Sequence, residues 1–185
     1  MVATLFSVGI ASPYYLKATA TPEQYVKRSI TGEPIWMDIR DANVIDTVSQ
    51  INNQLVKHNE GLLIAPNWPT LYPILQKKSP LWDIYFLFPE MEDRQKEMIE
   101  ELRHKNVNWV IIGDVPLDGR DDLRFKNTHP ILWQHFLEDF EIIKSNGLPD
   151  NYQLLHRKTT AFPPQQLLAG LHTLHSLPSL PITAT

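Results

Sequence analysis

The sequence predicts an α/β fold, a three-layer, Rossmann-like open sheet that is mainly parallel and ends in a C-terminal β-hairpin. The first observation is that short apolar runs typical of buried strands alternate with longer amphipathic segments typical of helices. Right-handed crossovers in that order cover both faces of a sheet with helices. The second is the length of 185 residues, which suits one ordinary domain rather than two.

Composition excludes several classes of protein. Hydrophobic residues are 43% and charged residues 21%, close to the globular average, which argues against wholesale disorder and against a polytopic membrane protein. The net charge of -4 gives no electrostatic attraction for a polyanion, so nucleic acid is not an expected partner. Because cysteine is absent, disulfides, thiolate metal sites, iron-sulfur clusters and cysteine nucleophiles are excluded.

The chain divides into an N-terminal segment (1–40), an α/β domain (41–158) and a flexible tail (159–185) that has no charged side chain. Residues 2–11 form an apolar run of about ten residues, whereas a membrane-spanning helix needs about 20. The run also lacks the charged leader of a secretory signal. Two interpretations stay open: a buried first element, or the end of a membrane helix.

The first predicted element is a short helix from Thr21 to Ser29, because Thr21 can cap it and Pro22 suits its first turn. An amphipathic helix follows over residues 41–57, where apolar side chains recur at helical spacing. Gly61 ends that segment, and residues 62–65 are a short apolar run closed by a proline, which is typical of a buried strand.

The second half of the domain continues the alternation. Residues 90–104 are predicted to form a helix, because acidic residues lie early and basic residues late in this segment, which suits the helix dipole. The remaining predicted elements are a short helix that begins at 68 and ends near 77–78, strands at 84–88 and 107–112, a helix that begins at 128–130, and a terminal hairpin of strands 140–144 and 152–156.

Ligands of open α/β sheets sit beyond the carboxyl ends of the strands, which here are the loops 66–69, 89–91 and 114–127. The first loop has two prolines and no glycine, which disfavours a phosphate cradle. Asn67 and Trp68 in this loop can line a polar pocket with an aromatic wall, a chemistry suited to sugar rings. The alternative is a rigid turn with Trp68 in the core.

A second candidate is the loop that contains Asp114, Asp118, Arg120 and Arg124. Residues 118–124 bring together three carboxylates and two guanidinium groups, which can bind an anionic ligand, a sugar or a divalent cation. The alternative is a solvated loop whose charges pair with one another. The seven histidines lack metal-binding spacing and no serine lies in a nucleophile elbow, so no catalytic residue, metal or cofactor is predicted.

A longer set of residues resembles a known family. It comprises Leu62-Leu63-Ile64-Ala65-Pro66, Tyr72, Lys78-Ser79-Pro80, Phe88-Pro89-Glu90, Val110-Ile111-Ile112, Pro116-Leu117-Asp118-Gly119-Arg120, Phe125, Thr128-His129-Pro130, Trp133 and Tyr152-Gln153-Leu154-Leu155. In order and spacing it resembles the extracytoplasmic C-terminal domain of bacterial polytopic glycosyltransferases related to the protein mannosyltransferases. The resemblance covers residues 40–158, and the tail departs from it.

The resemblance implies membrane helices outside this chain, a polyprenyl-phosphate-linked sugar donor, and a soluble domain on the periplasmic or outer face of the membrane. Such enzymes carry their catalytic acid in an early loop that this chain lacks, so no catalytic residue is transferred. The expected function is a non-catalytic domain that helps to recognise a glycan, a lipid-linked sugar acceptor or a polypeptide acceptor, or that stabilises the membrane part. The alternatives are a stand-alone cytoplasmic protein or enzyme that binds a nucleotide or sugar phosphate, and a structural interaction module.

Overall fold

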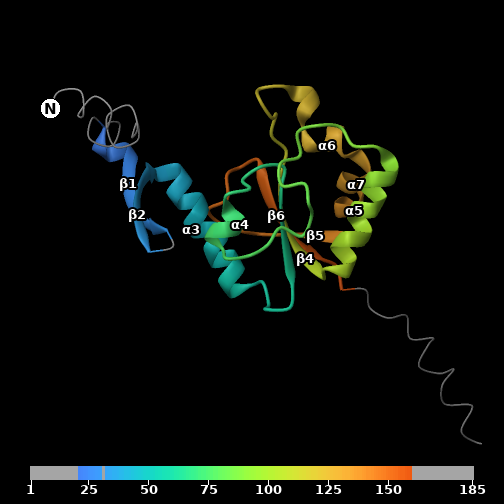
Figure 1. Ribbon diagram of the computed structural model, residues 1–185, viewed down its shortest axis with the longest axis horizontal. Helices are drawn as coiled ribbons and strands as arrows, with labels where there is room; N and C mark the ends of the chain where they lie inside the picture. Colours follow the sequence, from blue (N-terminus) through green and yellow to red (C-terminus); the bar gives the residue numbers. More distant parts are fainter. Residues whose placement is uncertain (1–20, 31, 160–185) are drawn as a thin grey trace, which may run out of the picture.

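The computed structural model describes residues 21–30 and 32–159, and it has mixed α/β architecture with a four-stranded sheet at its centre (Figure 1). The sheet has the strand order β3-β4-β6-β5. Its strands are β3 (Gly61–Ala65), β4 (Val107–Gly113), β5 (Phe140–Ile143) and β6 (Tyr152–Arg157). The predicted strands at 62–65 and 107–112 and the predicted C-terminal hairpin are confirmed.

The sheet is mixed, so the prediction of a mainly parallel sheet is wrong. Only β3 and β4 run parallel, whereas β6 is antiparallel to both β4 and β5. A parallel pair needs a crossover such as the one that α5 (Glu92–His104) helps to form between β3 and β4. The chain between β5 and β6 holds no helix, so these two strands pair as a hairpin.

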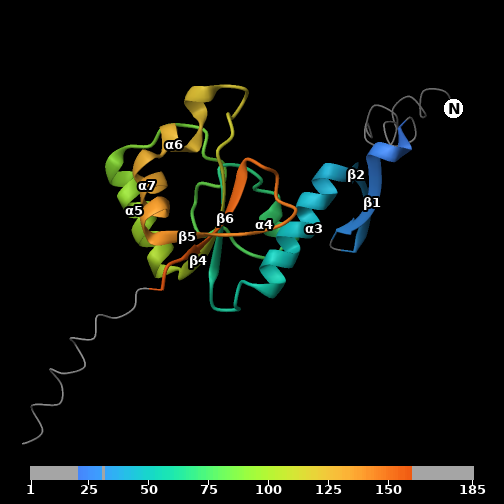
Figure 2. The ribbon, with the colours of Figure 1, turned by 180° about the vertical axis from the view of Figure 1, so that it is seen from behind.

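Helices cover both faces of this sheet, as Figures 1 and 2 show from opposite sides. Helices α5 and α7 (Pro130–Asp139) pack on one face, and α3 (Ile39–Gln54) and α4 (Leu71–Ile74) pack on the other. Side chains of a strand alternate between faces. Accordingly Val110 and Ile112 of β4 belong to the first core cluster, while Trp109 and Ile111 belong to the second.

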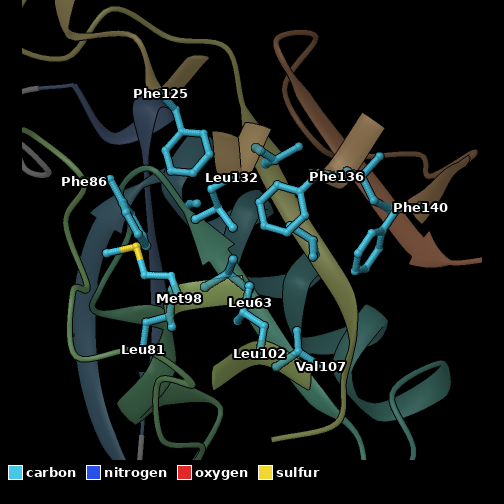
Figure 3. Packing of buried hydrophobic residues seen from close by; sticks show 14 residues of the cluster. Leu63, Leu81, Phe86, Met98, Leu102, Val107, Phe125, Leu132, Phe136 and Phe140 are labelled. Atoms are coloured by element: carbon cyan, nitrogen blue, oxygen red, sulfur yellow. The ribbon is translucent and has the colours of Figure 1, made fainter. Parts of the chain in front are cut away.

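The face under α5 and α7 carries the larger aromatic core (Figure 3). Four buried phenylalanines contribute to it: Phe86, Phe125, Phe136 and Phe140. Met98 and Leu102 of α5 and Leu132 of α7 fill the space between these rings and the sheet. Burial of these large side chains is the main favourable contribution to folding on this face.

Helix α3 begins two residues before the predicted position, because Asp38 rather than Asp41 caps it. The Asp38 carboxylate accepts a hydrogen bond from the Arg40 backbone N–H at 2.8 Å. The helix then buries Ala42, and it contributes the buried Val48 and Ile51 to the second core cluster. The predicted helices at 41–57 and 90–104 are thus confirmed, with ends that differ by at most three residues.

The predicted helix from Thr21 to Ser29 is wrong. A 3-10 helix, η1 (Pro22–Gln24), is followed by an antiparallel hairpin of β1 (Tyr25–Ile30) and β2 (Glu33–Asp38). Pro22 therefore starts a helix, as predicted, but this helix lasts only one turn. After it, tertiary packing favours strands. An ion pair of 3.1 Å between Arg28 and Asp46 joins β1 to α3.

The predicted strand at 84–88 is also wrong, since these residues have no regular secondary structure. Phe86 is buried in the core and its backbone N–H donates to the Pro66 carbonyl at 2.9 Å, but no ladder follows. Ile84, Tyr85 and Phe88 are instead exposed. Their apolar character is what made the segment resemble a buried strand.

The loop 114–127, predicted to be polar and irregular, contains η2 (Asp121–Leu123) and the short helix α6 (Phe125–Thr128). No helix within residues 21–30 and 32–159 is long and apolar enough to cross a membrane. The predictions for the apolar run at 2–11 and for the tail beyond Thr159 lie outside the described residues.

Candidate functional site

The candidate site lies at the edge of the sheet where β3 and β4 end. Strand β6 is antiparallel to β4, so its first residue, Tyr152, pairs with Gly113, the last residue of β4. The loop after β3, the loop after β4 and the start of β6 therefore meet at one edge. This is the edge at which the sequence predicts ligand binding.

Asn67 and Trp68 of the first loop both contact Tyr152. The Trp68 indole stacks on the Tyr152 ring with centroids 3.9 Å apart and planes 13° from parallel. The Tyr152 hydroxyl donates a hydrogen bond to Oδ1 of Asn67. Burial raises the pKa of Tyr152 to about 12, although the hydrogen bond to Asn67 opposes this shift, so the phenol stays protonated as a donor.

Trp68 adopts a left-handed backbone conformation with φ of +70°, which is unfavourable for a residue with a side chain. Such a conformation persists only where surrounding contacts hold it, and the stack on Tyr152 is one such contact. Trp68 is half-buried, and one side of its ring packs against the second core cluster, as expected for the alternative of a rigid turn with Trp68 in the core. Its other side faces a groove.

The groove has a volume of about 570 Å³ and lies between β2, the first turns of α3 and the loop that follows β3. Two tryptophans line it, Trp36 from β2 and Trp68 from the loop. The other lining residues are Ile35, Met37, Arg40, Asp41, Val44, Ile45, Thr70, Leu71 and Pro149. A concave, mostly apolar site with a few polar groups is the usual form of a small-molecule site.

Three polar side chains border this groove: Arg40, Asp41 and Thr70. The guanidinium of Arg40 donates to both carboxylate oxygens of Asp38, from Nε at 3.1 Å and from Nη2 at 3.2 Å. This side-chain hydrogen bond lowers the pKa of Asp38, so the carboxylate that orients Arg40 remains charged. The groove therefore offers a charged donor, a hydroxyl and a carboxylate beside two indole rings.

Asp114 and Arg124, which the sequence singles out, lie together in the loop after β4. The Asp114 carboxylate pairs with Lys126 at 2.9 Å and with Arg124 at 3.3 Å. Arg124 also pairs with Asp121 at 2.7 Å. These groups form a self-paired network, and none of them lines the groove.

Asp118 and Arg120 have a different place. Asp118 and Gly119 both have positive φ, and the Arg120 N–H donates to the Leu117 carbonyl at 2.9 Å, which makes a tight turn. Arg120 pairs with Asp122 at the surface. Burial raises the pKa of the Tyr85 phenol and the nearby Asp118 carboxylate raises it further, so Asp118 lies against the exposed loop that contains Tyr85.

Sequence reasoning thus found Trp68 in the groove but missed Trp36, Arg40, Asp41 and Thr70. Trp36 was missed because the hairpin was taken for a helix followed by an irregular segment. The glycine turn at Gly32 between two short segments that contain β-branched residues was a usable signal for that hairpin. Among the described residues, no three histidine, aspartate or glutamate side chains lie close enough to hold a metal ion.

Gly113 controls the position of Tyr152, which gives a testable prediction. A Cβ atom at Gly113 would lie 2.5 Å from Cε1 of Tyr152, so Gly113→Ala is expected to displace the ring and weaken its stack on Trp68. We expect the free energy of unfolding to fall by about 1–2 kcal/mol, as for overpacking of a core. Urea unfolding measures it.

The control for this prediction is the same change in a Tyr152→Ala background, where the clash is absent. There Gly113→Ala is expected to cost less than about 0.5 kcal/mol, and the difference is the coupling energy between the two positions. Equal costs in both backgrounds would mean that Gly113 does not position Tyr152.

Two tryptophans and three polar side chains thus line one groove of the described residues. Comparisons of the chain with protein-family models, with curated proteins and with solved structures find no match.

Proposed function

We propose that this chain is a non-catalytic domain of a membrane glycosyltransferase-like protein and that its groove recognises a glycan or a glycan-bearing acceptor. The observation that carries the proposal is the placement of Trp36 and Trp68 in one groove with Arg40, Asp41 and Thr70. Sugar rings have apolar C–H faces and polar hydroxyl edges. Indole rings suit the faces, while a carboxylate, a guanidinium and a hydroxyl suit the edges.

The family resemblance also supports glycan recognition, because it covers the loop that contains Trp68 and the strand that begins with Tyr152. On this proposal the domain belongs to the extracytoplasmic face of a bacterial inner membrane, and membrane segments outside this chain anchor it.

The Rossmann-like, three-layer description of the sheet is part of the proposal. Helices on both faces support it, whereas the antiparallel strands weigh against it.

The alternative of a nucleotide or sugar-phosphate site in the loop 114–124 has less support. Asp114, Asp121 and Asp122 each pair with a cation of the same loop or of α6, which leaves little free charge for a ligand. The alternative of a structural interaction module rests on the exposed side chains of Trp82, Phe88 and Met91.

The test of recognition is a titration with mannobiose, cellobiose, diacetylchitobiose and a glucuronate-containing oligosaccharide, followed by the indole N–H resonances of the tryptophans. We expect saturable shifts of Trp36 and Trp68 with a Kd on the order of 1 mM, or about -4 kcal/mol. Trp36→Ala and Trp68→Ala are each expected to weaken binding at least about tenfold, as for central aromatic residues of binding sites.

The matched control is Trp82→Ala, because Trp82 is 89% exposed and does not line the groove. It is expected to leave the Kd within about twofold of the original value. No saturable shift across the panel, or an equal loss in Trp82→Ala, would remove glycan recognition from the proposal.

The membrane part of the proposal has its own test. An antibody raised to this domain is used to blot the membrane and soluble fractions of the source cells. We expect a species much larger than 21.4 kDa in the membrane fraction. A soluble species of about that mass would contradict the proposed parent protein.

A further inference from the structure

A second pocket lies at the other end of β3, away from the groove. It has a volume of about 380 Å³ and is bordered by the segment after α4, the end of α5 and the first residues of β3. We call it the lysine pocket and define it by Lys77, Lys78, Ser79 and Lys105, which line it together with Glu60, Gly61, Leu62 and Pro80. It shares no residue with the groove.

The charges around the lysine pocket are unbalanced. Three ammonium groups line it against one carboxylate, that of Glu60, in a chain whose net charge is -4. Within the part of the chain that the structure describes, neither Lys77 nor Lys78 forms an ion pair, and Lys78 forms no hydrogen bond either. Like charges at adjacent positions repel each other, and an anion bound between them offsets this repulsion by attracting both.

The nearby carboxylates already have partners. Glu60 accepts hydrogen bonds from Nε1 of Trp109 at 3.0 Å and from the Lys57 backbone N–H at 3.2 Å. Glu101 pairs with Arg94 at 2.7 Å and with Lys105 at 3.3 Å. Lys105 is therefore already paired with Glu101, and within the described residues the lysines of the pocket without an ion-pair partner are Lys77 and Lys78.

One ammonium group is held in place at the pocket. Nζ of Lys105 donates to the Pro80 carbonyl at 2.5 Å, which ties the end of α5 to the segment after Ser79. Two residues beyond Pro80, the side chain of Trp82 is 89% exposed. A large apolar surface thus stands close in sequence to a cluster of positive charge.

We propose that the lysine pocket binds the phosphate group of a phosphate ester. A phosphate group carries negative charge and several acceptor oxygens, which lysine ammonium groups bind as compact point charges. The pocket is larger than a bare phosphate needs, so part of the ester enters with it, and Leu62 and Pro80, which also line the pocket, offer apolar surface to the organic part. The same chemistry is found in water-soluble esters and in phospholipid head groups.

The test uses the full chain and two kinds of probe. Glucose 1-phosphate is titrated while the backbone amide resonances of residues 77–79 are followed, with glucose as the reference that lacks phosphate. We expect saturable shifts with glucose 1-phosphate only, and weaker binding as salt rises because screening acts on exposed charges. The second probe is a pair of vesicle preparations, one of phosphatidylglycerol with phosphatidylcholine and one of phosphatidylcholine alone. Vesicle binding is followed by the tryptophan fluorescence of the chain.

The variant Lys77→Gln/Lys78→Gln is expected to weaken binding of the ester or of the anionic vesicles at least about tenfold, as for loss of charged hydrogen bonds. The matched control Lys27→Gln/Lys144→Gln removes two exposed lysines elsewhere and is expected to change binding by less than about twofold. Thermal unfolding of both variants checks that each remains folded.

Binding of glucose 1-phosphate without vesicle binding would identify a soluble ester, and binding of the anionic vesicles would identify a lipid head group. The proposal is overturned if neither probe binds, if glucose binds as well as its phosphate, or if both double variants lose binding equally. Because Trp36→Ala leaves the lysine pocket intact, failure of the glycan test and failure of this test are distinguishable.

Discussion

Replacement of Phe125 by alanine is expected to lower the free energy of unfolding by about 4 kcal/mol, as for other fully buried phenylalanines. Phe125 is 0% exposed, and its ring contacts those of Phe86 (Figure 3) and His129, with centroids at 5.2 and 5.0 Å. The ring joins the irregular segment before α5 to α6 and α7. Its loss leaves a cavity that the short helix α6 is poorly able to close.

Urea unfolding measures this change, with an unaltered dependence on urea expected if the unfolded state is the same. The control is Trp82→Ala, which removes a larger aromatic side chain from an 89% exposed position and is expected to change stability by less than about 0.5 kcal/mol. A loss of less than about 1 kcal/mol in Phe125→Ala would show that the aromatic core of Figure 3 does not hold this face together.

The second large effect is a loss of stability in acid that depends on His129. This residue is 1% exposed, and its Nδ1 lies 2.9 Å from Oγ1 of Thr128. Burial lowers the pKa of His129 from 6.5 to about 4, although the negative charge of Asp83 works in the opposite direction. The imidazole is therefore neutral in the folded protein over a range in which it is protonated in the unfolded chain.

The sign follows from proton binding. Between pH 6.5 and 4 the unfolded chain binds more protons at His129 than the folded protein does, so stability falls as the pH falls through this range. At 1.36 kcal/mol per pKa unit the full loss is about 3 kcal/mol. Burial also lowers the pKa of His135, which adds to the loss in the same direction.

Urea unfolding from pH 7 to 4 measures this slope in the original chain, in His129→Asn and in the control His104→Asn, which alters an exposed histidine. His129→Asn is expected to be less stable at pH 7 because packing is lost, but to show a flatter dependence on pH. The control is expected to keep the original slope. A slope that persists in His129→Asn would contradict the assignment.

Local patterns predicted the elements that depend on local physics. Apolar spacing indicated α3, the order of acids and bases indicated α5, and the two apolar runs that became β3 and β4 were recognised from their composition. The hairpin of β5 and β6 was found because two short strand-like runs flank a glycine-containing loop. In each of these cases the residues that form the element also carry the signal for it.

The wrong predictions concern segments whose structure depends on distant partners. The residues of β1 and β2 form strands by pairing with each other and by packing on α3, and the ion pair between Arg28 and Asp46 spans 18 positions. Ile84 and Tyr85 have strand-like composition, but this segment meets the chain after β3 through the hydrogen bond of Phe86 to Pro66 and forms no ladder with it. The direction of β6 likewise depended on how the chain returned to the sheet.

The candidate site divides in the same way. Local patterns were enough to predict that Asn67 and Trp68 follow a buried strand and that the charged loop 114–124 follows the next one, because strand ends are local features. The stack of Trp68 on Tyr152, 84 positions away, and the groove that Trp68 shares with Trp36 follow instead from the folded arrangement of the chain. Those contacts join residues that are remote along the chain, and packing of the hairpin on α3 and pairing of β6 with β4 bring them together.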